Sequence, residues 1–334
     1  MPALQNLLRL AVAATGCLCI ASQAVAAGDP FTSQAQPANA LIVPFDAVDR
    51  STMIVVSNLT GKTEVEGGGF LLGVTTHWVF WDRRGGHLAD VWICLTLNDT
   101  IVVDPTNLSD IDVANHPIRP VIDLSGQRGF AVITAYQTDE ICTDGATVGA
   151  TLVNDAITGG FSITSANGTE LSGNALGLAT DASGSFTNLP DFRLSTGGVG
   201  SLDLMALDPS VLESSLVVLV ALKERKGALS GEVGPLPKRV TAPLVFYDDW
   251  EVPTSLPDVT FRGARFTSFM PGPGGLAPDT ITFGSPGIFR LTDVRAGNTP
   301  VGCNSFVYAF GASTVGNLTT SLSGQYSADG AGCG

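Results

Sequence analysis

Residues 76 to 95 read THWVFWDRRGGHLADVWICL and contain three of the chain's four tryptophans and two of its three histidines. Imidazole nitrogens bind transition metals and exchange protons near neutral pH, so two histidines this close in sequence suggest a metal or catalytic site. Apolar residues on both sides of an Arg-Arg-Gly-Gly segment are also typical of a β-hairpin. The stretch therefore has two interpretations, a reactive site or a well-packed hairpin.

The predicted register of this hairpin separates the two histidines. If Arg-Arg-Gly-Gly is the turn, Asp82 lies opposite His87 and His77 lies opposite Trp92. Because side chains alternate between the faces of a strand, His77 and His87 then point to opposite sides of the sheet and cannot share a metal ion. We expect structural roles, with His77 reaching diagonally to Asp90 and His87 pairing with Asp82. Apolar residues on both faces predict that both are covered, and the sequence does not identify what covers the second.

No complete catalytic motif is present. Hydrolysis by a serine or cysteine needs an activating base and an oxyanion hole, and the pattern Gly-x-Ser-x-Gly is absent. A histidine-dependent triad has three candidate bases, His77, His87 and His116, and none has an identifiable partner. We therefore assign no catalytic residue and favour a non-enzymatic protein over a histidine-based hydrolase.

Two acidic clusters could supply ligands or catalytic carboxylates. Calcium prefers six to eight oxygen ligands, and Asp104, Asp110 and Asp112 define a speculative calcium site. Their spacing is not that of an EF-hand, and aspartate is also an ordinary turn residue, so we favour a structural role. The second cluster is Asp248-Asp249-Trp250-Glu251. No other cofactor is predicted.

The first 26 residues have the pattern of a secretory signal peptide. They carry one arginine, no acidic residue, an apolar stretch and a final Ala24-Val25-Ala26, and we predict cleavage after Ala26. The alternative is a lipoprotein, because the segment ending in Cys17 resembles a lipobox. Either route predicts a secreted, periplasmic or surface-located protein.

Cysteine usage agrees with export. Cys17 and Cys19 leave with the signal peptide, and four cysteines remain, which allow three pairings. We favour disulfides that close loops within each half of the chain, namely Cys94–Cys142 and Cys303–Cys333. A metal site is less favoured because the spacing of these cysteines matches no zinc motif.

Charge and hydropathy limit the partners of the protein. The formal net charge is −14, which disfavours nucleic acid and anionic lipid. Beyond the leader, the longest apolar run, residues 216–223, has the length of a strand, so no transmembrane helix is predicted. These properties leave a protein or glycan partner at the cell surface.

Short apolar or alternating runs separated by Gly, Pro, Asn and Asp predict an all-β chain, an antiparallel β-sandwich with little helix and stabilising disulfides. The best helix start is Asp208-Pro209. The expected strands are 40–45, 52–58, 69–82, 89–97, 100–103, 129–137, 150–154, 160–166, 215–223, 243–248, 279–284, 287–293 and 305–313.

Composition also predicts the domain organisation. We expect a β-sandwich domain over residues 27–235, with a loop insertion at about 167–207 that is rich in Gly, Ser and Thr. Gly and Pro cluster near residues 230–244, which indicates a second β region over 236–334. The alternative is that both parts form one interleaved sandwich.

Residues 41–103 contain LIVPFDAVDRSTMIVVSNLTG, then THWVFWDRRGGHLADVWICLTLNDTIVV. This run resembles uncharacterised exported bacterial proteins, with a Val-Pro-aromatic strand, a strand ending in Asn, and strands ending in FWD and LTLND. The resemblance implies a secreted or surface-located β-sandwich and no activity. The sequence thus favours an exported non-enzymatic structural or interaction component. The alternative is a secreted carbohydrate-active or calcium-stabilised glycan-binding protein that uses the acidic loops.

Overall fold

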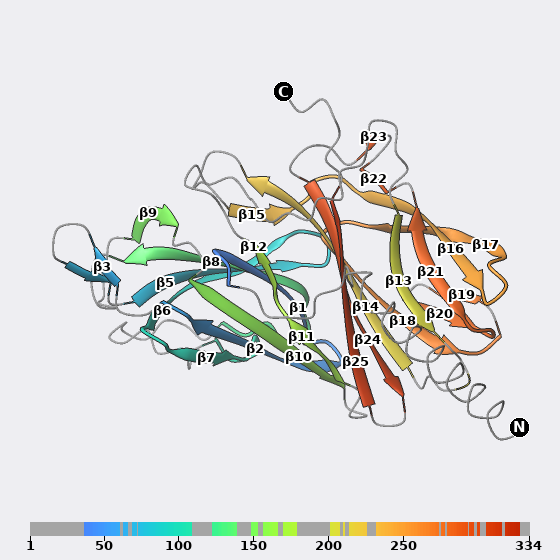
Figure 1. The fold of residues 1–334 in the computed structure, drawn as a ribbon, viewed down its shortest axis with the longest axis horizontal. Coiled ribbons are helices and arrows are strands. Elements are labelled where there is room, and N and C mark those ends of the chain that lie inside the picture. The colour runs from blue at the N-terminus through green and yellow to red at the C-terminus, as the bar shows by residue number, and fades with distance from the viewer. Residues whose placement is uncertain are drawn as a thin grey trace, which may run out of the picture. The chain divides into compact units, whose positions relative to one another are not determined.

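The described residues of the computed structural model form β-strands and no α-helix (Figure 1). The structure describes residues 37–60, 63–65, 69–71, 73–108, 122–138, 148–152, 156–165, 170–178, 201–207, 210, 214–225, 232–273, 275–277, 279–292, 294–296, 299–300, 305–315 and 318–327. Within these ranges, no helix is long and apolar enough to cross a membrane. The described residues all belong to one compact unit, residues 33–334. The prediction of an all-β chain with antiparallel sheets is confirmed.

Two sheets come from the first half of the chain. Their strands are β1 (Ala40–Asp46), β2 (Arg50–Asn58), β5 (Gly73–Asp82), β6 (His87–Thr96), β7 (Thr100–Val103), β8 (Arg128–Thr138), β9 (Val148–Leu152), β10 (Ile157–Ser165), β11 (Glu170–Asn174) and β12 (Leu176–Leu178). One sheet has the order β12-β1-β8-β5-β6, with β9 paired to β8, and the other has the order β11-β10-β2-β7. A separate hairpin joins β3 (Thr63–Val65) to β4 (Gly69–Leu71).

The inner faces of these two sheets share one buried apolar cluster. Phe45 and Phe80 of the first sheet lie in it together with Ile54 and Phe161 of the second. Phe45 and Phe80 are fully buried, and their rings meet edge to face at a centroid distance of 5.7 Å. Successive side chains of a strand point to opposite faces of the sheet, and accordingly every second residue of β2 is buried.

Two further sheets come from the second half. Their strands are β13 (Ser201–Leu207), β14 (Ser214–Arg225), β15 (Glu232–Pro235), β16 (Val240–Asp248), β17 (Pro253–Phe261), β18 (Ala264–Pro271), β19 (Gly275–Ala277), β20 (Thr280–Phe283), β21 (Gly287–Thr292), β22 (Arg295–Ala296), β23 (Thr299–Pro300), β24 (Ser305–Val315) and β25 (Leu318–Ser327). One sheet has the order β13-β21-β16-β22-β23, with β17 on β16. The other has the order β19-β20-β18-β14-β24-β25, with β15 on β14. The pair β18–β20 is parallel, and the other described pairs are antiparallel.

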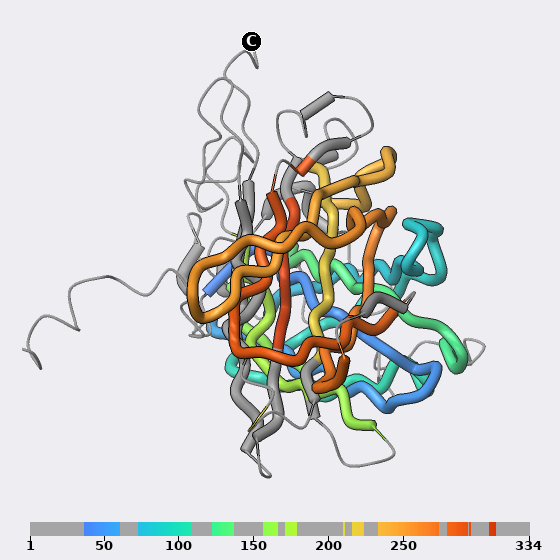
Figure 2. The backbone as a smooth tube through the Cα atoms, turned by 90° about the vertical axis from the view of Figure 1, so that its right-hand side faces the viewer, coloured from blue at the N-terminus to red at the C-terminus, as the bar shows by residue number. Residues whose placement is uncertain are grey.

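Strand β14, in the yellow part of the tube in Figure 2, is buried on both faces. Leu216, Val218 and Val220 belong to the apolar cluster of the first half, whereas Val217 and Leu219 belong to a second cluster between the C-terminal sheets. A strand covered on both sides has no polar alternation, which is why this part of the chain is a continuous apolar run. β14 therefore connects the two cores.

Three strands, β11, β12 and β13, lie within the segment 167–207 that is predicted as a loop insertion. β11 (ELSGN) pairs with β10 through the backbone, which does not require large apolar side chains. The proposed boundary at residue 235 does not coincide with a change of sheet, since β13, β14 and β15 pair only within the C-terminal sheets. The predicted helix start at Asp208-Pro209 lies outside the described residues.

Candidate functional site

The hairpin of β5 and β6 has the predicted register along most of its length. His77 pairs with Trp92, Trp78 with Val91 and Phe80 with Ala89. The predicted pairing of Asp82 with His87 is wrong, because the register shifts after Phe80 and Trp81 lies opposite His87. The extra residue on β6 is Leu88, so this strand contains a β-bulge next to the turn.

Asp82 closes the turn beside the bulge. Its Oδ1 accepts hydrogen bonds from the backbone N–H groups of Arg84 and Gly86, both at 2.7 Å. Its backbone carbonyl accepts from Gly85 N–H at 3.0 Å, and Gly85 has φ = 77°. The carboxylate is thus occupied in closing the loop, and the bulge accommodates the displaced residue on β6.

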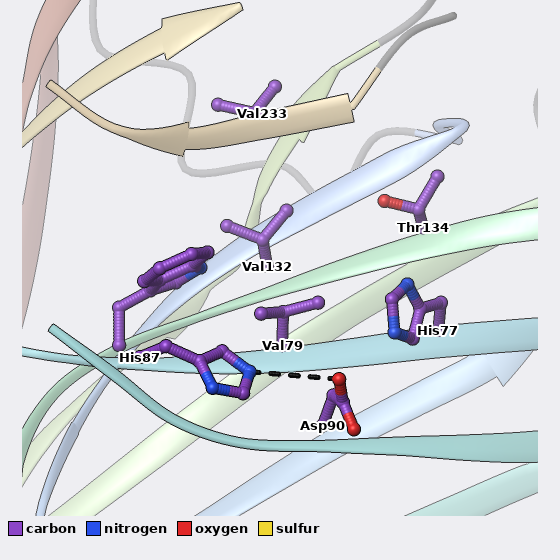
Figure 3. A pocket seen from close by; sticks show the side chains of 8 residues that line it. His77, Val79, His87, Asp90, Val132, Thr134 and Val233 are labelled. Atoms are coloured by element: carbon purple, nitrogen blue, oxygen red, sulfur yellow. Dashed lines mark ion pairs between the residues drawn. The ribbon is translucent and has the colours of Figure 1, made fainter. Parts of the chain in front are cut away.

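The bulge places His87 on the same face as His77, so the prediction of opposite faces is wrong. Figure 3 shows both imidazoles on one side of the hairpin with Asp90 between them. His87 Nε2 lies 3.7 Å from Asp90 Oδ2, with both side chains about half exposed. The predicted contacts were His77 with Asp90 and His87 with Asp82, and the observed ion pair instead joins His87 to Asp90.

These side chains line a pocket of about 120 Å³. The ring of His77 stacks on Trp92, with centroids 4.0 Å apart and planes 8° from parallel. The ring of His87 meets Trp81 edge to face at 5.4 Å. The lining comes from four strands and consists of His77, Val79, Trp81, His87, Asp90, Val132, Thr134 and Val233 (Figure 3). Two aromatic contacts therefore position the imidazoles.

Residues of the C-terminal half of the chain cover the second face of the β5–β6 hairpin. Val233 of β15 lies over the pocket and is 4% exposed. Next to the turn, Ala264 N–H donates to the backbone carbonyl of Arg83 at 3.1 Å, and Asp279 lies 3.9 Å from the Arg83 guanidinium. Arg128 of β8 lies over the ring of Phe266, 5.8 Å from its centroid. This contact between the halves answers the question that the sequence left open.

Gly263 permits this close approach, and we expect Gly263→Ala to lower the free energy of unfolding by about 2 to 3 kcal/mol. Gly263 has φ = 77°, and a Cβ there would lie 2.6 Å from the backbone nitrogen of Gly85. Gly126 is a matched control, since it has φ = 75° with no atom within 4 Å of a Cβ. Gly126→Ala should lower the free energy of unfolding by only about 1 to 2 kcal/mol, the cost of a left-handed backbone conformation for alanine. Urea unfolding of both variants measures the difference, and equal losses would show that the contact with the turn is not tight.

The pocket has no accessible serine or cysteine nucleophile among its lining residues. No Ser, Cys, Lys or Arg is among its lining residues, and the hydroxyl-bearing Thr134 is 3% exposed, too little to meet a substrate carbonyl. Across the part of the chain that the structure describes, no three His, Cys, Asp or Glu side chains form a group that could hold a metal ion. The arrangement can bind a small polar ligand through Asp90 and the imidazoles.

The acidic clusters act as turn caps where they are described. Asp104 Oδ1 accepts from the N–H and the hydroxyl of Thr106, both at 2.8 Å. Asp110 and Asp112 lie outside the described residues, so the calcium site stays a prediction. Asp248 Oδ1 accepts from Trp250 N–H at 3.0 Å and Val252 N–H at 2.8 Å in the turn between β16 and β17. Neither Asp104 nor Asp248 lines the histidine pocket.

Of the remaining predicted residues, the structure describes only Cys94. Cys94 lies half-buried on β6, and Cys142, Cys303 and Cys333 lie outside the described residues, as does His116. The sequence pattern did not predict Thr134 and Val233 as neighbours of the histidines. Val233 lies in a Gly- and Pro-rich segment, and no local pattern predicts which distant strand it covers.

No protein family, curated protein or solved structure matches this chain. The resemblance of residues 41–103 to exported bacterial proteins therefore stays a prediction. The chemistry of the pocket rests on the chain's own residues.

Proposed function

We propose that the protein is an exported, non-enzymatic β-sandwich protein that acts as a structural or interaction component of a cell surface or matrix. The observation that carries the proposal is β14, whose two buried faces pack into two apolar clusters, one on each side of the strand. Such a core favours a rigid scaffold. The pocket beside it offers no accessible nucleophile among its lining residues.

Export is supported by the leader and by the cysteines. The apolar leader ending in Ala24-Val25-Ala26 precedes the first described strand, β1, by 13 residues. We propose that Cys94 forms a disulfide with Cys142. Disulfides persist in oxidising compartments, so this bond favours a location outside the cytosol.

An interaction role is supported by exposed apolar side chains. Trp250 is 81% exposed at the tip of the β16–β17 hairpin, and the adjacent Val252 is 54% exposed. Exposed aromatic residues on a fixed turn are typical anchors of binding surfaces. The alternative, a carbohydrate-active or calcium-stabilised protein, is less favoured because the Asp104 and Asp248 carboxylates are each occupied in their own turn.

Expression of the full chain in a bacterial host tests the export proposal. We expect the protein outside the cytoplasm, with Ala27 as its first residue by intact mass and with a Cys94–Cys142 peptide in a non-reduced digest. A lipidated N-terminus at Cys17 would support anchoring, and Cys17→Ala would then release the protein. Cytoplasmic protein with an intact leader would contradict export. Deletion of residues 2–26 is the control, and it should retain the protein in the cytoplasm.

A further inference from the structure

We propose that the pocket between His77 and His87 binds a small organic cation, a primary ammonium group on a short aliphatic chain. This inference goes beyond the proposed function, which assigns no ligand. It does not depend on export, so its failure would leave the proposed function standing.

The bulge in β6 builds the site. Without Leu88 as an extra residue, His87 would lie opposite Asp82 and point away from the pocket, as the sequence predicts. His87 and Asp90 are about half exposed, so placing them together adds little to the buried core. Bulges that re-aim a side chain occur frequently beside functional sites. The bulge beside the Asp82 turn thus also directs His87 into the pocket.

The charge of the pocket selects a cation. Asp90 is the one carboxylate among the lining residues, and no Lys or Arg is among them. The whole chain carries a formal net charge of −14, which attracts cations and repels anions. Asp90 Oδ2 and His87 Nε2 lie 3.7 Å apart, and both side chains are about half exposed. A ligand in the pocket can therefore contact both groups.

The hydrogen-bonding groups match a primary ammonium ion. An ammonium group has three N–H donors and no acceptor, so it needs acceptors on several sides. Asp90 supplies carboxylate oxygens to the pocket. An imidazole that carries a single proton has one acceptor nitrogen, and both His77 and His87 line the pocket. His77, held flat against Trp92, forms the far wall.

The apolar lining and the volume define the rest of the ligand. Val79, Val132 and Val233 provide a wall for an aliphatic chain. The volume of about 120 Å³ is below the roughly 150 Å³ of a cavity that holds benzene, which limits the chain to a few carbon atoms. A metal ion fits less well, since no described group of three donors converges on one point.

Titration of the purified full-length chain with n-propylammonium chloride tests the proposal. n-Propanol and propionate are controls of nearly the same shape that differ in charge. Tryptophan fluorescence reports on binding, because Trp81 and Trp92 both contact the imidazoles. We expect a saturable response to propylammonium, and affinity for propanol and propionate at least about tenfold lower.

Two matched variants locate the binding site. Asp90→Asn should weaken propylammonium binding by about tenfold or more, because it removes the charged acceptor. Asp49→Asn removes the same charge from an exposed turn and should leave the affinity within about twofold. Urea unfolding confirms that both variants fold. Equal affinity for propanol, an unchanged affinity in Asp90→Asn, or a saturable response to zinc chloride without one to propylammonium would each overturn the proposal.

Discussion

Replacement of Trp78 by alanine is expected to lower the free energy of unfolding by about 3 to 5 kcal/mol. The indole is 0% exposed and lies in the apolar cluster of the first half, with its ring 6.5 Å from that of Phe80. Removal leaves a large cavity, because a close-packed core collapses only partly around it.

A hydrogen-bond chain adds to this loss. Trp78 Nε1 donates to Thr76 Oγ1 at 2.7 Å, and the Thr76 hydroxyl donates to the backbone carbonyl of Ile93 at 2.8 Å. Thr76 is fully buried, so alanine at position 78 removes its donor in an environment without water. Trp78→Phe keeps most of the volume and should cost clearly less than Trp78→Ala.

Urea unfolding followed by far-ultraviolet circular dichroism measures the effect of Trp78→Ala independently of tryptophan fluorescence. The control is Trp250→Ala, the same change at a side chain that is 81% exposed, and it should alter stability by no more than about 0.5 kcal/mol. Similar losses in the two variants would show that Trp78 is not part of a packed core.

The hairpin around these residues shows how far local sequence pattern reaches. Alternation was sufficient to predict the pairing of His77 with Trp92, because a shift by one residue would expose Trp78. It failed beside the turn, where the capping bonds of Asp82 compete with strand pairing. The same error separated the two histidines, so the pocket could not be predicted from the pattern.

The other errors have a common physical origin in distant pairing. The apolar run of β14 correctly predicts a strand, but whether one or both faces are buried depends on distant parts of the chain that pack on it, as the two apolar clusters that share β14 show. Gly and Pro in residues 230–244 resemble a linker, yet Glu232–Pro235 pairs with β14 and places Val233 over the pocket. Edge strands such as β11 carry small polar residues that look like a loop.

Replacement of Asp46 by alanine is expected to lower the free energy of unfolding by about 3 kcal/mol, because it removes the buried carboxylate of a partly buried ion pair. Asp46 at the end of β1 is 0% exposed, and its Oδ2 accepts from Arg50 Nη1 at 2.8 Å. Its Oδ1 accepts from Val48 N–H at 3.0 Å. Alanine would leave the guanidinium and this N–H without their acceptor in the turn between β1 and β2.

The carboxylate and the backbone contribute separately to this turn. The backbone of Asp46 exchanges two hydrogen bonds of 2.9 Å with the hydroxyl of Thr52, and these should survive the substitution. Asp46→Asn keeps the shape and one acceptor oxygen, so it should cost less than Asp46→Ala. Asp49→Ala is the control, since it changes an exposed carboxylate of the same turn and should cost no more than about 0.5 kcal/mol.

A double-mutant cycle with Arg50→Ala separates the ion pair from the hydrogen bond to Val48. If the pair dominates, the double variant is more stable than the sum of the two single losses implies, because the second substitution removes a charge that is already unpaired. Urea unfolding in low and high salt adds a second readout. In 1 M salt the Debye length is about 3 Å, so exposed charges are strongly screened. The Asp46 carboxylate is buried, so the coupling free energy of the pair should persist in 1 M salt. Additive losses, or coupling that salt abolishes, would show that Asp46 acts as a turn cap rather than as a buried ion.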